Sequence, residues 1–150
     1  MPRRRSDDFF EIEQLLYRYG RAIDAKDWKA LELVFTRDAR IHYAMERGAE
    51  VSFAELGPWL AQAMRIFEVT QHVITNPLIE LTGDSAQCVS YLQATHLQVR
   101  HDGTRVRTTE GGRYSDTLVR TPEGWRISSR RLDRTWVDGE YLGPDQAKLF

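Results

Sequence analysis

The chain has 150 residues, a length that fits one domain able to bury about two thirds of the surface of its unfolded chain. A formal net charge of −1 and a pI of about 6.4 argue against the clustered basic surface that nucleic-acid binding needs. No apolar run reaches the ~18 residues of a membrane span, and no apolar core of a secretory signal follows the N-terminal arginines. The single Cys88 leaves no partner for an internal disulfide. We therefore expect one cytoplasmic domain over residues 1–150.

The first element in chain order is an amphipathic helix. Ser6 is a candidate N-cap, followed by acidic residues in the first turn, where the helix dipole favours negative charge. Apolar residues then recur at spacings of 3, 4, 3 and 4, at Phe9, Ile12, Leu16, Tyr19 and Ile23. This spacing predicts a helix that ends near Asp24, behind a frayed N-terminus at residues 1–6.

Next come a short helix and a strand. Asp27 is placed to cap the short helix, whose apolar residues are Trp28, Leu31 and Val34. Residues 38–45 alternate like a strand and predict one inward set of side chains, Ile41, Tyr43 and Met45. The opposite face then carries His42 and Ala44.

The third helix has two candidate starts. Ser52 and Glu55 form a capping-box pattern, and Pro58 could instead occupy a first helical position. In either case the helix runs to about Glu68. Its apolar side chains are Trp59, Leu60, Met64 and Phe67.

From Thr70 onward the sequence has the character of β-structure. Turn signals at 82–85, 101–103 and 121–124 separate three alternating runs, at 86–100, 105–120 and 125–136, ahead of a C-terminal tail at 138–150. Helices followed by a meander of long antiparallel strands are typical of an α+β fold. A curved sheet with helices packed on one face would enclose a pocket between them.

The familiar catalytic motifs do not occur in the sequence. It contains no G-x-S-x-G elbow, P-loop, dinucleotide-binding glycine pattern or H-E-x-x-H. The four histidines, His42, His72, His96 and His101, do not fall at metal-ligand spacing. We therefore predict no metal site.

Several polar residues occupy positions that the pattern places inside the fold. Asp24 ends the first helix, where the helix dipole disfavours a carboxylate. One possibility is that Asp24 caps the next helix. The other is that Asp27 caps it and Asp24 serves another purpose. Tyr19 and Tyr43 lie on apolar faces, so their hydroxyls need partners. His72 is either a packed histidine or a catalytic base, with no means of deciding from its own segment alone.

The later strands add a second group of candidates. His96 shares a strand face with Cys88, Leu92 and Ala94, which favours a satisfied core histidine over a ligand. The last strand places Arg130, Leu132, Arg134 and Trp136 on one face. Each arginine is therefore either at the rim, with its stem packed, or buried beside an anion.

Four segments together resemble the SnoaL-like branch of the nuclear transport factor 2-like superfamily. They are "LLYRYGRAIDAKDWKALELVFTRDARIHY", "TQHVITN", "GDSAQCVSYLQATH" and "GWRISSRRLDRTW", and the resemblance runs from about Phe10 to Trp136. It implies a cone-shaped α+β barrel, in which a strongly curved sheet wraps around a long N-terminal helix and encloses a hydrophobic pocket. It also implies a homo-oligomer, either a dimer or a trimer.

Three enzyme groups of that superfamily are similar at the pocket positions. Scytalone dehydratase carries residues that match Asp24, Tyr43, His72 and His96, but its tyrosine beside the aspartate is Ile23 here and its pocket asparagine falls near Tyr114. Bile-acid dehydratase matches at Tyr19, Asp24, His72 and Arg134. Hexachlorocyclohexane dehydrochlorinase shares the aspartate–histidine pair, and its pocket arginine falls nearer Arg130.

The resemblance implies a cofactor-independent lyase that acts on a hydrophobic ring substrate. His72, oriented by Asp24, would be the general base, with Tyr19 and Arg134 as further catalytic residues. Substrate contacts would come from Tyr43, His96, Arg130, Tyr114, Trp59, Met64 and Phe67. An isomerase or polyketide cyclase would use the same first step. A non-catalytic binding protein, or a structural subunit like the small subunit of ring-hydroxylating dioxygenases, is the alternative.

Overall fold

The structure, a computed structural model, describes residues 5–43 and 50–150. Its helices are α1 (Arg5–Asp24), α2 (Trp28–Leu31), α3 (Phe53–Ala63) and the 3₁₀ turn η1 (Met64–Ile66). Its strands are β1 (Phe35–Tyr43), β2 (Val51–Ser52), β3 (Val69–Thr82), β4 (Ser85–Val99), β5 (Arg105–Thr121) and β6 (Gly124–Asp138). The predicted order of helices and strands, and the α+β class, are confirmed.

The first two helices follow the pattern of apolar residues. α1 buries a continuous stripe that includes Ile12, Leu16 and Tyr19, and it ends at Asp24 as predicted. The Asp27 side chain accepts a hydrogen bond from the Ala30 backbone N–H and so caps α2. The prediction of Ser6 as N-cap is wrong: α1 already includes Arg5, so Ser6 lies within the helix. Side-chain preference alone places a helix end only to within a residue or two.

The third helix begins with the predicted capping box between Ser52 and Glu55. Pro58 lies inside α3, so the alternative that placed it at the first helical position is wrong. α3 continues into η1 and ends at Ile66, slightly before the predicted end at Glu68. On the preceding strand, β1 starts at Phe35 rather than at residue 38, and the expected positions of Ala44 and Met45 fall outside the described residues.

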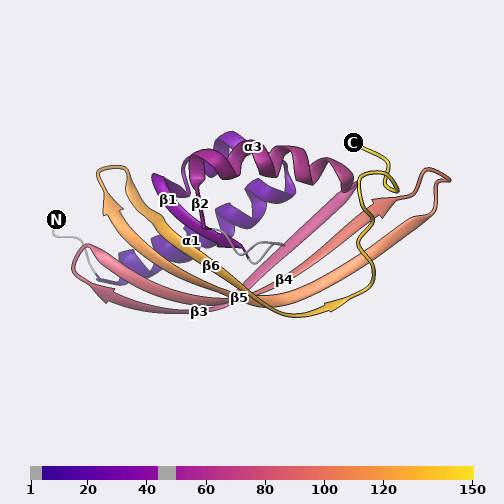
Figure 1. The fold of residues 1–150 in the computed structure, drawn as a ribbon. Coiled ribbons are helices and arrows are strands. Elements are labelled where there is room, and N and C mark those ends of the chain that lie inside the picture. The colour runs from indigo at the N-terminus through magenta and orange to yellow at the C-terminus, as the bar shows by residue number, and fades with distance from the viewer. Residues whose placement is uncertain (1–4, 44–49) are drawn as a thin grey trace.

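One six-stranded sheet runs in the order β2-β1-β6-β5-β4-β3. Strands β3 to β6 form the predicted antiparallel meander, whereas β1 pairs with β6 in parallel, so the sheet is mixed. Figure 1 shows the sheet as a deep curve with α1 and α3 on its concave side. The core lies between this concave side and α1.

Two glycines in β5 lie at an irregularity in its pairing with β6. The pairing of β5 with β6 shifts register between Gly111 and Gly112, and such a bulge bends a strand. A Cβ at Gly111 would overlap the Trp136 indole, and one at Gly112 would lie 2.5 Å from the Asp133 carbonyl oxygen. Only glycine therefore fits where the two strands bend together.

The segment after β6 is attached to the sheet along its length. The Gln98 side chain forms two hydrogen bonds with the Leu142 backbone, donating to its carbonyl at 3.0 Å and accepting from its N–H at 2.8 Å. Farther along, the Lys148 N–H donates to the Val99 carbonyl at 2.7 Å. In Figure 1 this segment returns over one half of the sheet, near the end of α3. The predicted tail is therefore a packed part of the fold.

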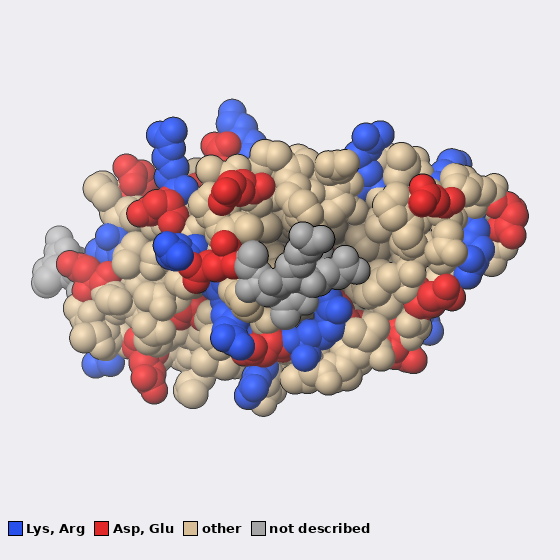
Figure 2. Space-filling model, viewed as in Figure 1, with Lys and Arg blue, Asp and Glu red and all other residues tan. Residues whose placement is uncertain are grey.

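The surface carries charges of both signs. On the face drawn in Figure 2, lysines and arginines lie among aspartates and glutamates, without a continuous basic region. None of the helices in the described part of the chain is long and apolar enough to cross a membrane.

Candidate active site

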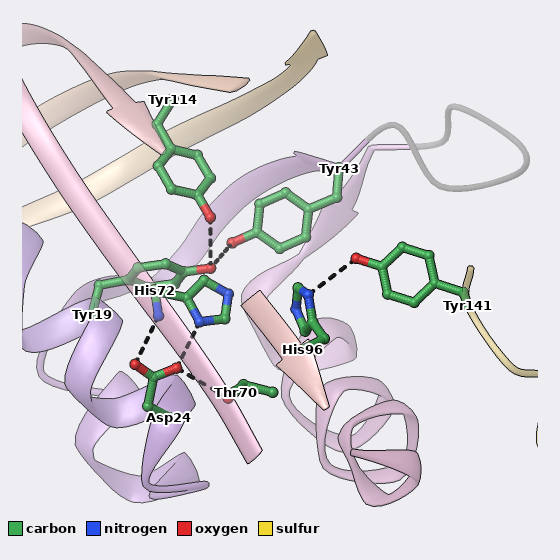
Figure 3. Close-up of polar contacts among 8 residues, drawn as sticks. All are labelled: Tyr19, Asp24, Tyr43, Thr70, His72, His96, Tyr114 and Tyr141. Carbon is green, nitrogen blue, oxygen red and sulfur yellow. Dashed lines mark hydrogen bonds and ion pairs between the residues drawn. The ribbon is translucent and has the colours of Figure 1, made fainter. Parts of the chain in front are cut away.

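Asp24 and His72 form the centre of the site (Figure 3). Asp24 Oδ1 lies 2.7 Å from His72 Nδ1 and accepts a 3.0 Å hydrogen bond from the Thr70 hydroxyl. Its Oδ2 accepts a 2.9 Å hydrogen bond from the His72 backbone N–H. Thr70 and His72 are two apart on β3, so both side chains point to the same face and reach one carboxylate.

Close packing of α1 on β3 makes this contact possible. A Cβ on Gly20 would lie 3.4 Å from the His72 carbonyl oxygen, at the near limit of ordinary contact. Gly20 therefore leaves room for β3 to pass close to the last turn of α1. Asp24, at the end of that turn, then meets the donors of β3.

The donors around Asp24 set its charge state. Partial burial would raise the pKa of Asp24, but the hydrogen bonds from the side chain and backbone of His72 outweigh it and lower the pKa. Asp24 is therefore a carboxylate at neutral pH. Because a carboxylate only accepts hydrogen bonds, His72 Nδ1 is the donor of this contact, and Nε2 is the ring nitrogen that Asp24 does not bind. The His72 side chain is only 8% exposed.

Three tyrosine hydroxyls meet on the other side of His72 (Figure 3). The Tyr19 hydroxyl lies 2.7 Å from that of Tyr43 and 3.4 Å from that of Tyr114. Burial and the neighbouring Tyr19 raise the pKa values of Tyr43 and Tyr114 well above 10, so both are neutral. Three hydroxyls hold three protons and these two contacts use two, so one O–H is not used within the group.

Arg130 lies beneath these tyrosines and is fully buried. Its guanidinium pairs with Asp116 through two hydrogen bonds of 2.7 Å, and it stacks 4.2 Å from the Tyr19 ring centre and 4.0 Å from that of Tyr114. Burial opposes the charge, but Asp116 raises the pKa of Arg130 well above its usual value. Nη1 has no hydrogen-bond partner among the described residues. The structure thus makes Arg130 a buried support of the tyrosines rather than an exposed anion-binding group.

His96 faces His72 from β4. The ring centres are 5.6 Å apart and nearly perpendicular, and Phe67 packs 4.8 Å from His96 on another side. The Tyr141 hydroxyl lies 3.1 Å from His96 Nδ1 (Figure 3). Burial, then the neighbouring His72, lowers the pKa of His96 to about 4, so this ring is neutral at neutral pH.

Arg134 lies nearer the rim than Arg130. Its side chain is 37% exposed, and Nε lies 2.8 Å from Oε2 of the buried Glu110. Although the two arginines share a face of β6, four residues of strand separate them by about 13 Å. Arg130 is therefore fully buried beneath the tyrosines, whereas Arg134 is partly exposed.

The expected apolar residues divide between the inside and the outside. Met64 and Phe67 are buried in the core cluster, with Phe67 against His96. The expectation that Trp59 lines the interior is wrong: it is 41% exposed and lines an outer hollow of about 410 Å³ with Arg65, Pro144 and Leu149. Trp59 is one residue from the buried Leu60 and therefore about 100° around the helix from it.

Four site residues were missed at the level of sequence. Sequence patterns do not identify Asp116 or Tyr141 as site residues, because their partners depend on strand register and on the path of the segment after β6. Glu110 is not identified by sequence patterns for the same reason. Thr70 could have been found, since it is two residues before His72 on the same strand face. No group of three metal-ligating side chains comes together in residues 5–43 and 50–150.

Known proteins share both sequence and fold with this chain. The sequence profile of the SnoaL-like domain matches residues 4–131. An uncharacterised protein of Mycobacterium bovis is 37% identical over 79 residues, which are 53% of this chain and 54% of that protein. An uncharacterised Mycobacterium tuberculosis protein matches to the same extent. The chain spans about half the length of the curated relatives it matches.

Three solved structures give the fold its context. A protein from Kribbella flavida is 28% identical with a TM-score of 0.81, covering 89% of this chain and 94% of its own. A Novosphingobium aromaticivorans protein, provisionally assigned as a scytalone dehydratase, is 23% identical with a TM-score of 0.77, covering 94% and 91%. A hexachlorocyclohexane dehydrochlorinase is 16% identical with a TM-score of 0.75, covering 93% and 96%. At these last two identities the likeness concerns the fold alone. Because the family profile matches residues 4–131, the chain belongs to the SnoaL-like domain family.

Proposed function

We propose that the protein is a cofactor-independent lyase of the dehydratase or dehydrohalogenase kind, with His72 as its general base. The observation that carries the proposal is the set of three hydrogen bonds that fix Asp24 against Thr70 and His72. They hold the imidazole in one orientation and one tautomer. A positioned base of this kind contributes about 10²- to 10⁴-fold to a rate.

The step is a proton transfer coupled to elimination. His72 Nε2 takes a proton from a carbon of the substrate, the C–H electron pair forms a carbon–carbon double bond, and the leaving group departs with its own electron pair. Asp24 stabilises the imidazolium that forms. The leaving group is hydroxide, released as water after protonation, or halide. The imidazolium then returns its proton to the leaving group or to solvent.

The tyrosine hydroxyls supply the second requirement, a donor where negative charge develops. If the substrate carries a carbonyl beside the reacting carbon, the free O–H among Tyr19, Tyr43 and Tyr114 can donate to its oxygen. Arg134, at the rim, is the candidate to stabilise the leaving group. The aromatic residues and Met64 around the site favour a small hydrophobic ring substrate.

The same first step serves an isomerase or a polyketide cyclase, because both remove a proton beside a carbonyl. What differs is where the electrons and the proton go next. A non-catalytic binding protein would instead use His72 only for packing, and the experiment below separates that alternative from the lyase.

The test is turnover of cyclic β-hydroxy ketones and chlorinated cyclohexanes by wild type, His72→Ala and the exposed control His101→Ala. Formation of the conjugated ketone is followed by ultraviolet absorbance, and halide release by an electrode. We expect turnover by wild type and the control, and a loss of about 10²-fold or more in His72→Ala with a thermal midpoint close to wild type. No turnover by wild type, combined with a large drop in the thermal midpoint of His72→Ala, would favour the packing role.

A further inference from the structure

The buried ion pair of Arg130 and Asp116 lies on the same face of the sheet as the tyrosines. Arg130 on β6 and Asp116 on β5 are cross-strand partners. Tyr114 is two residues before Asp116 on β5, so the two side chains point to the same face. Tyr43 on β1 pairs with Leu132, which is two residues after Arg130. The register of three strands therefore brings the ion pair and two of the tyrosines together.

The guanidinium of Arg130 stacks on two tyrosine rings. Its Cζ lies 4.2 Å from the ring centre of Tyr19 and 4.0 Å from that of Tyr114, and the two rings stand at 82° to each other. Asp116 accepts hydrogen bonds from Nε and Nη2, whereas Nη1 has no hydrogen-bond partner in the described part of the chain. A cation over a ring attracts the electrons of that ring and stabilises negative charge on it. The phenol hydroxyl is then a stronger hydrogen-bond donor.

Asp116 carries the opposite charge but has the smaller effect on the tyrosines. Burial is the largest influence on the pKa values of Tyr43 and Tyr114 and raises both. Arg130 lowers both pKa values, and Asp116 raises that of Tyr43 by less than Arg130 lowers it. The ion pair therefore acts on the tyrosines mainly through its cation.

The three hydroxyls form a chain with one end over Arg130 (Figure 3). The Tyr114 hydroxyl lies 3.4 Å from that of Tyr19, which lies 2.7 Å from that of Tyr43. Tyr19 and Tyr114 are 3% and 2% exposed, whereas Tyr43 is only partly buried. When Tyr114 donates to Tyr19 and Tyr19 donates to Tyr43, each bond strengthens the next, and the unused proton is that of Tyr43.

We propose that Arg130 acts through the tyrosines, as a positioning residue whose positive charge strengthens the Tyr43 hydroxyl as a donor to a ligand oxyanion. The ligand class is a ring compound with a carbonyl beside the carbon that His72 deprotonates. The C–H electron pair then moves onto the carbonyl oxygen, the proton goes to His72, and the product of the step is an enolate. This ligand class rests on the proposed function, whereas the effect of Arg130 on the tyrosines does not.

The test uses 2-naphthol, the aromatic counterpart of the enol of the cyclic ketone 2-tetralone. Naphtholate absorbs at longer wavelength than naphthol, so a pH titration of the bound ligand followed by absorbance gives its pKa. Arg130→Met/Asp116→Leu replaces the ion pair by apolar side chains and leaves no unpaired charge in the core. Arg131→Met/Asp133→Leu makes the same change in an exposed ion pair on the same strand and is the matched control.

We expect wild type to bind 2-naphthol and to lower its pKa below that of the free compound. In Arg130→Met/Asp116→Leu the ionisation constant of the bound naphthol should fall about tenfold, which is the size of one cation–π interaction, while the control matches wild type. Arg130→Gln/Asp116→Asn removes both charges but keeps polar side chains, and it should give the same fall if the apolar pair disturbs folding, as judged by circular dichroism.

Tyr43→Phe removes the hydroxyl at the end of the chain and should also raise the pKa of the bound naphthol. An unchanged pKa in Tyr43→Phe or in a folded variant without the ion pair would overturn the proposal, as would an absence of saturable binding by wild type. A purely structural Arg130 would change the thermal midpoint without changing the pKa of the bound naphthol. Binding of 2-naphthol needs no proton removal by His72, so failure of this proposal and failure of the proposed function are distinguishable.

Discussion

The buried, neutral His96 makes stability depend on pH in a defined direction. Its pKa is about 4 in the folded protein, against 6.5 for the ordinary side chain. Between these values the unfolded chain binds the proton and the folded protein does not, so acid favours unfolding. The stabilising contribution is present above pH 6.5 and is lost as the pH falls through about 4.

The magnitude follows from the separation of the two pKa values. Lowering the pH from about 7.5 to about 4.5 should cost wild type about 2 kcal/mol more than His96→Gln, which has no proton to gain there. Urea unfolding at both pH values, fitted for the free energy of unfolding, measures the difference between the two proteins. His101→Gln serves as the control for removing an exposed histidine.

Groups that do not interact with His96 are common to wild type and His96→Gln, and their titration cancels in the comparison. An equal loss of unfolding free energy in the two proteins would refute the reasoning. It would mean that His96 is accessible to protons in the folded protein, in conflict with its burial between Phe67 and Tyr141.

Two further predictions concern the supports of the site, each measured by urea unfolding. Arg130→Met leaves Asp116 charged and unpaired in the core, so we expect a loss of about 3–5 kcal/mol in the free energy of unfolding. The double variant Arg130→Met/Asp116→Leu should recover most of that loss. A double variant as unstable as Arg130→Met would contradict the buried ion pair. Thr70→Val removes one of the hydrogen bonds to Asp24 and should lower the free energy of unfolding by about 0.5–1.5 kcal/mol. The carboxyl pKa of Asp24, followed by NMR, should rise because a hydrogen bond to the charged form is lost. An unchanged Asp24 pKa would count against the Thr70 contact.

The sequence predicts the elements of the fold well because the periodic patterns are local. The stripe on α1, the capping box at Ser52 and the turns at 82–85, 101–103 and 121–124 each depend on a few neighbouring residues. For Asp24, local reasoning left two roles open, a cap for α2 or another purpose, and its pairing with His72 was implied only by the family resemblance. Asp27 caps α2, so the carboxylate at the end of α1 needed another partner.

The rest depends on contacts between distant residues. Asp116 and Arg130 face each other only because β5 and β6 pair in one register, and a shift of one residue would turn the two side chains to opposite faces. The two arginines of β6 share a face, but Arg130 is fully buried and the Arg134 side chain is 37% exposed, a difference that strand alternation alone does not predict. Tyr141 lies in a segment with no periodic pattern, and its position follows from the Gln98 side chain.

The central claim is that His72, held by Asp24, removes a proton from carbon. The most direct measurement is the exchange of the α-protons of 2-tetralone in D₂O, followed by proton NMR, because it needs neither a leaving group nor the natural substrate. The account predicts that wild type accelerates exchange and that His72→Ala loses about 10²-fold or more, while His101→Ala exchanges like wild type. Exchange at equal rates with wild type and His72→Ala, both folded, would contradict it.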